Sequence, residues 1–190
     1  MRDASPAPRV DAPAFEAVRD RRSWSKVTDE APSHAALLQL VAAAGRVADH
    51  SALAPWRLIE LRGDDRERLG RAINKANGEH GSSPKPLRAP LLIAIVASHR
   101  ESDKVPRWEQ AAVAAGVAHT LSLLLDEAGW GVIWRTGHYT RAKAVARAHG
   151  LRKGEELLGW LYVGGKPERD RPARRKPVDA ESHLSRMPHP

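Results

Sequence analysis

The sequence contains no cysteine among its 190 residues, and this absence excludes several kinds of chemistry at once. Disulfide bonds, thiolate nucleophiles, cysteine-bound zinc and iron–sulfur clusters all require cysteine. Long apolar runs are absent as well: the longest, around residues 111–118, is far too short to cross a bilayer. The N-terminal stretch has no apolar signal segment. We therefore expect a cytoplasmic protein with no membrane partner.

Common catalytic and nucleotide-binding motifs are also missing. The sequence has no Gly-x-Gly-x-x-Gly, no Walker A loop, no His-Glu-x-x-His and no Gly-x-Ser-x-Gly. Its nine histidines are scattered without metal-ligand spacing, so no metal site is expected. No acid–base pair and no nucleophile stands out from the sequence.

Positive charge is what the chain has in excess, with a formal net charge of +8. Residues 166–190 hold seven Lys or Arg and four Asp or Glu, a net +3, which leaves +5 on the rest of the chain. A basic body suits nucleic acid, an anionic membrane or a phosphorylated small molecule. Net charge does not choose among these three.

The hydrophobic pattern predicts one domain at residues 13–165, after a disordered segment at 1–12 and before a basic, proline-rich tail at 166–190. For that tail, packing on a partner subunit is one option. Within the domain, the sequence predicts helices at 14–22, from Ser33 onward, at 64–76, 108–128 and 140–149, and strands at 56–62, 91–97, 130–135 and 158–163. This order indicates an α+β fold with a central mixed sheet flanked by helices. Between 111 and 118 the long helix is apolar all round, so we expect a partner subunit to supply one wall around it.

The first candidate site contains Arg21, Arg22 and Ser23, which offer planar guanidinium donors and a short hydroxyl to a phosphate. The alternative is a solvated helix end. A second candidate is the stretch RVADHSALAPWR at 46–57, where His50 and Ser51 could meet the edge of a ligand. The alternative there is an ordinary helix-to-strand connection.

The third candidate site is GWGVIWRTGHYT at 129–140, whose glycines allow a flat ligand or a backbone to approach closely. Arg135 and Thr136 at the end of its strand offer further phosphate donors, and a β-turn with a surface arginine is the alternative. All three segments present groups for an anion, and none presents a general base. This combination suits a protein that holds a flat, phosphorylated cofactor which performs the reaction itself.

These segments resemble the flavin-dependent nitroreductases, and in particular the short, single-domain branch named NAD(P)H nitroreductases. The matching stretches cover about residues 15–165, and they are RRSWSKVTDEAPS, AGRVADHSALAPWR, RAPLLIAIVAS, KVPRWEQ, GWGVIWRTG and GWLYVGG. The resemblance implies an FMN-binding fold that works as a homodimer with FMN at the subunit interface. It also implies that NAD(P)H delivers hydride to flavin N5 and that a nitroaromatic, quinone or similar small-molecule oxidant then accepts it, in a ping-pong cycle.

The resemblance assigns roles residue by residue. It implies FMN contacts from Arg21, Arg22, Ser23, Arg46, His50, Trp134, Arg135 and Thr136. For the nicotinamide nucleotide it implies contacts from Leu124, Leu125, Asp126, Glu127, Ala128 and Gly129. The sequence departs from the family where many relatives have Gln before Pro-Trp, because Ala54 stands there.

Other functions stay open at this point. One is a basic nucleic-acid-binding protein that uses Arg169–Lys176 as a contact arm, although acidic residues interrupt the arm and no binding motif is present. Another is an FMN-binding relative that has lost turnover, given Ala54. A third is other flavin chemistry on the same fold, such as dehalogenation or flavin fragmentation.

Overall fold

The computed structural model of this protein describes residues 13–168 and 177–187. The segment 1–12 that we expect to be disordered, and the proposed contact arm at 169–176, lie outside the described residues. The helices are α1 (Pro13–Asp20), α2 (His34–Ala44), α3 (Asp64–Asn77), α4 (Arg107–Glu127) and α5 (Lys143–Ala148). The strands are β1 (Trp56–Leu61), β2 (Leu91–Ser98), β3 (Trp130–Arg135) and β4 (Glu155–Gly165). Short 3₁₀ turns lie at His50–Ala52, Lys85–Arg88 and His138–Arg141.

The four strands form one sheet in the order β1-β2-β4-β3. All three pairings are antiparallel, so the predicted α+β class is confirmed, whereas the mixed sheet is wrong for the described residues. Strand β3 is an edge of this sheet, and one of its sides is therefore open to other parts of the protein. Strand β4 bulges near Gly159, whose φ of 133° is a conformation that favours glycine.

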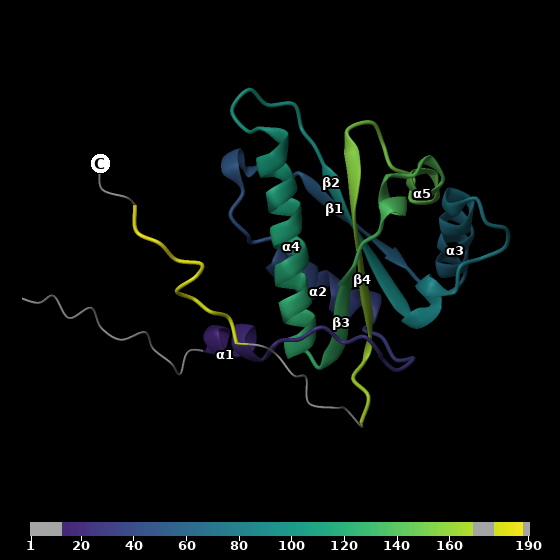
Figure 1. The fold of residues 1–190 in the computed structure, drawn as a ribbon, viewed down its shortest axis with the longest axis horizontal. Coiled ribbons are helices and arrows are strands. Elements are labelled where there is room, and N and C mark those ends of the chain that lie inside the picture. The colour runs from purple at the N-terminus through teal and green to yellow at the C-terminus, as the bar shows by residue number, and fades with distance from the viewer. Residues whose placement is uncertain (1–12, 169–176, 188–190) are drawn as a thin grey trace, which may run out of the picture.

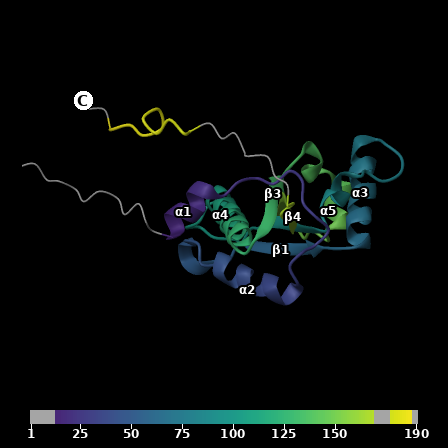
Figure 2. The same ribbon diagram turned by 90° about the horizontal axis from the view of Figure 1, so that it is seen from below.

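Strand β2 is buried along its whole length because helices cover both faces of the sheet. On one face α2 and α4 pack against Leu91, Ile93 and Ile95, and on the other α3 and α5 pack against the alternate residues of the strand. Figure 1 shows α4 and α2 on one side of the sheet and α3 and α5 on the other, and Figure 2 shows the same arrangement from below. Two hydrophobic clusters therefore stabilise the structure, one on each face of the sheet.

Local sequence signals explain where the helices begin and end. Helix α2 begins after Ser33, whose Oγ accepts a hydrogen bond of 3.2 Å from the backbone N–H of Ala36. Helix α4 ends before Gly129, which has a φ of 88°. The helix predicted at 140–149 is interrupted: a 3₁₀ turn comes first, and the extended residue Ala142 precedes α5.

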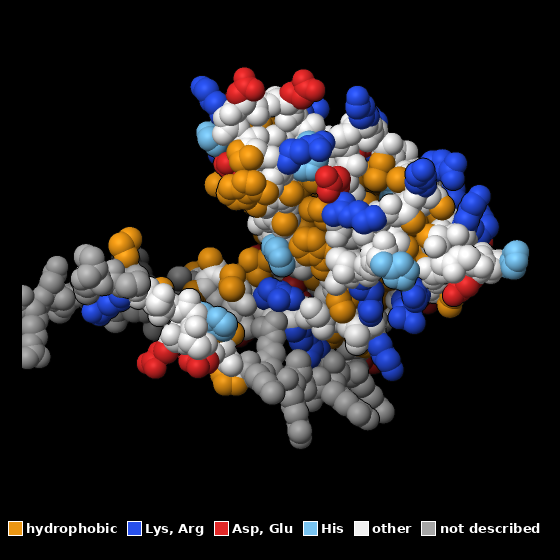
Figure 3. All heavy atoms as spheres, turned by 45° about the horizontal axis from the view of Figure 1, so that its top comes forward, with side chains coloured by type: hydrophobic (Ala, Val, Ile, Leu, Met, Phe, Trp, Pro, Cys, Tyr) orange, Lys and Arg blue, Asp and Glu red, His pale blue; other side chains and the backbone are white. Residues whose placement is uncertain are grey.

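Helix α4 keeps one side open. Val117, Leu121 and Leu125 are fully buried against the sheet, whereas Ala112 and His119 are exposed. Together with Trp108, which is 73% exposed, these residues have the spacing of one helix face. Figure 3 shows apolar side chains gathered over α4 on this side of the molecule. Among the described residues, no helix combines the length and the apolar composition needed to cross a membrane.

Candidate functional site

The Arg21–Ser23 segment lies beside β3 because the chain that follows it is bonded to the sheet. Trp24 donates its backbone N–H to the carbonyl of Val132 over 2.9 Å, and Thr28 donates to Gly165 over the same distance. Glycine makes this approach possible, since a Cβ added to Gly131 would lie 2.9 Å from Val27. The close approach at Gly131 is made by the side chains of Val27 and Trp24, from the segment that follows Ser23.

The indole of Trp24 anchors the same segment to the end of α4. Its Nε1 donates to the carboxylate of Asp126 over 3.0 Å, and Lys166 forms an ion pair of 3.1 Å with that carboxylate. The guanidinium of Arg22 lies 3.6 Å above the indole ring. We call Trp24, Asp126 and Lys166 the indole clamp. It fixes the chain immediately after Arg21–Ser23.

A cavity of about 330 Å³ opens beside β3, and it contains the third predicted segment. We call it the β3 cavity, and its lining is Lys85, Arg88, Ile133, Trp134, Arg135, Thr136, Tyr139 and Tyr162. Three of these side chains are cationic and none is acidic. Among the described residues, none of the three cations forms an ion pair. The cavity therefore attracts an anionic group.

Two buried donors at this end of β3 are unused. The buried Nε of Arg135 and the buried Nε1 of Trp134 have no hydrogen-bond partner in the described part of the chain. A buried donor without a partner is costly, so this strand end is suited to a ligand that supplies acceptors. Burial raises the pKa of Tyr162 to about 12, which keeps its phenol protonated at physiological pH.

Lys85 and Arg88 were not predicted as site residues from the sequence. They lie in and around the Gly-, Ser- and Pro-containing loop before β2, and only the folded chain brings this loop beside β3. The signal that could have identified them is a pair of cations at the entrance to a buried strand. Lys85 also lies 5.4 Å from the ring of Tyr139, which helps to hold it at the cavity.

The second predicted segment lies elsewhere, at the N-terminal half of α4. The Nδ1 of His50 lies 3.0 Å from a carboxylate oxygen of Glu109, and Arg46 is exposed nearby in the chain. The loop after His50 is strained, since Ser51, Ala52 and Ala54 all have positive φ values, of 62°, 50° and 45°. Asp49 supports this loop by accepting a hydrogen bond of 2.7 Å from the backbone of Ala54.

Within one chain, the predicted FMN contacts form two groups rather than one. Each group lies against a different residue of helix α4, so the helix gives the distance between them. His50 contacts Glu109, whereas the ring of Trp134 lies 5.0 Å from the ring of His119. His119 is ten positions after Glu109, which corresponds to about 15 Å along the helix axis. Arg46 and His50 therefore remain apart from Trp134–Thr136, whereas Arg21–Ser23 directly precede Trp24, which is bonded to Val132 of the same strand as Trp134.

The stretch expected to contact a nicotinamide nucleotide is the end of α4 and the turn that follows it. Leu125 is fully buried in the core, and the carboxylate of Asp126 is engaged in the indole clamp. Leu124 is half-buried, which leaves Glu127, Ala128 and Gly129 as the exposed part of the stretch. Nucleotide contact here stays a prediction.

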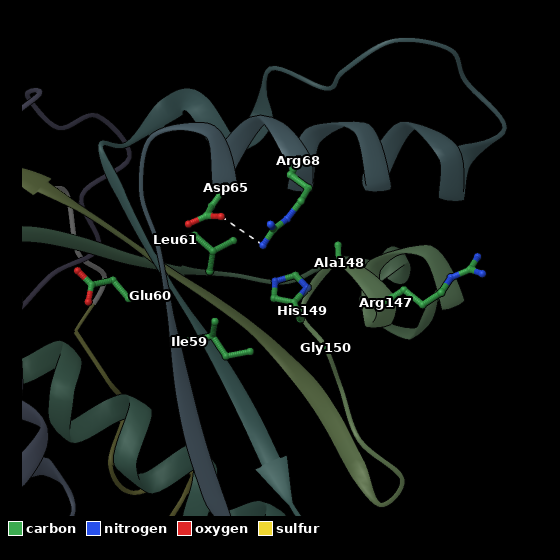
Figure 4. Close-up of a pocket in the computed structure, with 9 residues that line it drawn as sticks. All are labelled: Ile59, Glu60, Leu61, Asp65, Arg68, Arg147, Ala148, His149 and Gly150. Atoms are coloured by element: carbon green, nitrogen blue, oxygen red, sulfur yellow. Dashed lines mark ion pairs between the residues drawn. The ribbon is translucent and has the colours of Figure 1, made fainter.

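Another cavity, of about 480 Å³, lies between β1, α3 and α5, and Figure 4 shows its lining. Its buried His149 is fully satisfied, since Nδ1 lies 2.8 Å from the carbonyl of Val145 and Nε2 accepts from Trp160 over 2.9 Å. Burial lowers the pKa of His149, which agrees with a neutral ring. We assign this histidine a structural role. The described residues contain no cluster of His, Asp and Glu arranged to hold a metal ion.

Comparison with known proteins relates this sequence to one family. The sequence model described as "Nitroreductase family" matches residues 18–165. Escherichia coli K12 YdjA, which is named as an NAD(P)H nitroreductase, is 34% identical over 159 residues, or 80% of this chain and 87% of YdjA.

Two solved structures share the fold. A nitroreductase-like family protein from Bacillus cereus has a TM-score of 0.74 at 21% identity, covering 90% of this chain and 94% of that protein. A Bacteroides fragilis nitroreductase with bound FMN has a TM-score of 0.73 at 16% identity, covering 93% of this chain and all of that protein.

Proposed function

This chain belongs to the nitroreductase family, and on that premise we propose that it is an FMN-dependent NAD(P)H oxidoreductase whose oxidants are nitroaromatics, quinones or similar compounds. The observation that supports the cofactor most strongly is the β3 cavity, where the described residues supply three cations, no acidic side chain and no partner for the buried Nε of Arg135. FMN carries a phosphate and a ring edge rich in acceptors, so the donors present fit this group. Bound FMN would accept a hydride from NAD(P)H and pass it to the oxidant.

The residues of this chain would divide the binding of FMN between them. Arg21, Arg22 and Ser23 would donate to the phosphate and the ribityl chain, held in place by the indole clamp. Arg135 would donate from its buried Nε, and Thr136 would offer its hydroxyl. Lys85 and Arg88 would place positive charge beside the ring edge that becomes negative on reduction. These groups bind and orient, and none of them has to transfer a proton.

A second copy of the chain would supply Arg46 and His50 to the same FMN. Two observations support this. The two groups of predicted contacts lie about 15 Å apart along α4 in one chain. The exposed stripe of α4, which includes Trp108, Ala112 and His119, also lacks a covering element in the described residues. Packing of two α4 stripes against each other would bury this apolar surface and bring the two groups of contacts together.

The cofactor proposal is tested by FMN titration of Arg135→Gln against a matched control. Arg147→Gln removes the same charge at an exposed site, and its side chain points away from the neighbouring His149 in Figure 4. Loss of one charge-assisted hydrogen bond corresponds to about 1.5–3 kcal/mol, or roughly a 10- to 150-fold rise in the Kd for FMN. The control should bind FMN like the wild type. Equal affinity in all three proteins would contradict the assignment of Arg135.

A further inference from the structure

A third cavity, of about 680 Å³, lies where the loop between β2 and α4 meets the turn that precedes β4. These two connections lie side by side at the top of Figure 1. We call this cavity the loop pocket, and its lining is His99, Arg100, Glu101, Ser102, Asp103, Val105, Pro106, Arg107, Gln110, Lys153 and Gly154. It shares no lining residue with the β3 cavity.

The wall of the loop pocket is held rigidly by Gln110, the last residue of the KVPRWEQ stretch. Its side chain is fully buried, accepts from the backbone N–H of Arg100 over 2.7 Å, and donates to the carbonyls of Arg100 and Val105 over 2.9 Å each. Ser102 Oγ accepts from the N–H groups of Lys104 and Val105, which leaves its own hydroxyl proton to donate. The loop is thus preorganised.

The N-terminus of α4 opens into this pocket without a cap. Pro106 occupies the N-cap position and provides no side-chain hydrogen bond. The first intrahelical acceptor is used by Glu109 and Gln110, so the N–H groups of Arg107 and Trp108 have no helical partner. A helix of 21 residues also places partial positive charge at this end.

Three cations surround the same point, and none of them forms an ion pair within the described residues. They are Arg100, Arg107 and Lys153, and they outnumber the two acidic residues of the lining, Glu101 and Asp103. Arg107 reaches across the pocket, since a Cβ added to Gly154 would lie 3.9 Å from its Nη2. The positive groups therefore come from the loop, the helix and the turn.

A buried histidine provides an independent indication of a ligand. His99 is on the wall of the loop pocket, its side chain is only 4% exposed, and its Nδ1 has no hydrogen-bond partner among residues 13–168 and 177–187. The other ring nitrogen, Nε2, lies 3.5 Å from a carboxylate oxygen of Glu156. A buried ring nitrogen without a partner is rare in folded proteins, and a ligand in the pocket would satisfy it.

From these donors we infer that the loop pocket binds a phosphate monoester. Orphan N–H groups at a helix start, unpaired guanidinium and ammonium groups and a free hydroxyl proton are all donors, and they converge from three sides. A compact dianion with several acceptor oxygens matches this set better than a carboxylate does. The phosphate could belong to NADPH, which rests on the proposed function, or to a separate phosphorylated metabolite, which does not.

Inorganic phosphate tests the pocket without reference to redox activity. In calorimetric titrations of the protein purified with any bound cofactor, at low salt, the wild type should bind phosphate saturably. Arg107→Gln and Lys153→Gln should each weaken this binding about tenfold or more, while Arg147→Gln should leave it within about twofold. Absence of phosphate binding, or equal weakening in all three variants, would overturn the inference.

Adenosine 2′-phosphate separates the two sources. If it displaces inorganic phosphate, and if Arg107→Gln raises KM for NADPH without raising KM for NADH, the pocket serves the NADPH phosphate. If phosphate binds but adenosine 2′-phosphate does not compete, the ligand is a separate phosphorylated metabolite. In either case the FMN titration of Arg135→Gln is unaffected, so a failure of this inference is distinguishable from a failure of the proposed function.

Discussion

Replacement of Asp126 by alanine tests whether the indole clamp positions the Arg21–Ser23 segment. The carboxylate is 15% exposed and accepts from Trp24 Nε1 over 3.0 Å, and hydrogen bonds to charged groups contribute about 1.5–3 kcal/mol. Lys166 is 31% exposed, so water screens its ion pair, which adds only about 0.5 kcal/mol. We therefore expect Asp126→Ala to lower the free energy of unfolding by about 2–3 kcal/mol.

In a domain of this size, that loss corresponds to a fall in Tm of roughly 4–12 °C. Asp126→Asn keeps an oxygen that can accept from Trp24 but removes the charge, so its loss should be smaller, about 1 kcal/mol. Glu127→Ala is the matched control, because Glu127 is adjacent and exposed and belongs to the same predicted nucleotide-binding stretch. Its free energy of unfolding should stay within about 0.5 kcal/mol of the wild type.

Thermal unfolding and FMN titration of these variants separate a positioning role from nucleotide contact. The clamp predicts that Asp126→Ala weakens FMN binding several-fold while KM for NAD(P)H at saturating FMN stays unchanged. An unchanged Tm and FMN affinity combined with a raised KM for NAD(P)H would refute this reasoning. Asp126 would then face the nucleotide, as the resemblance to the family implies.

Two further predictions concern stability and assembly. Glu155, which is 2% exposed and bonded to both Arg57 and Arg152, has its pKa held below the ordinary glutamate value chiefly by hydrogen bonding to Arg57. The stability that the ionised Glu155 contributes is therefore complete above about pH 4.5 and lost as the pH falls through the lowered pKa. Glu155→Gln should lower the free energy of unfolding by about 2–3 kcal/mol at pH 7, as measured by chemical unfolding. The difference between the variant and the wild type should shrink in acid. Ala112→Arg on the open stripe of α4 should shift the protein from dimer to monomer in sedimentation velocity, because a charge would enter the proposed interface. A wild type that sediments as a monomer would contradict the shared site.

Elements with a strong local signal could be predicted from the sequence. The apolar run of β2 and the Pro-Ser start of α2 both correspond to observed elements, within one or two residues. The direction of strand pairing could not be predicted, because hydrophobic period does not encode it. A chain that alternates helices and strands is compatible with parallel or antiparallel pairing, and here each of the three hydrogen-bonded pairs of neighbouring strands is antiparallel.

The candidate site was predictable in its individual segments but not in its assembly. Arg135 and Thr136 follow from the glycine-flanked strand, and the fold attaches the chain after Arg21–Ser23 to that sheet through backbone bonds from Trp24 to Val132 and from Thr28 to Gly165. Lys85 joins them only through tertiary contacts, and the one local signal for it is its place with Arg88 in a pair of cations before a buried strand. The role of Asp126 in the clamp was likewise hidden, because its partner Trp24 is 102 residues away in the chain.

The proposed function is tested most directly by the visible spectrum of the purified protein during anaerobic titration with NADPH and with NADH. We predict an oxidised-flavin spectrum, release of FMN on denaturation, and bleaching by at least one of the two nucleotides followed by recovery of colour on adding a quinone or nitroaromatic. A protein that is colourless and remains so after incubation with FMN would contradict the account. A yellow protein that neither nucleotide bleaches would retain the cofactor but exclude the proposed electron donor.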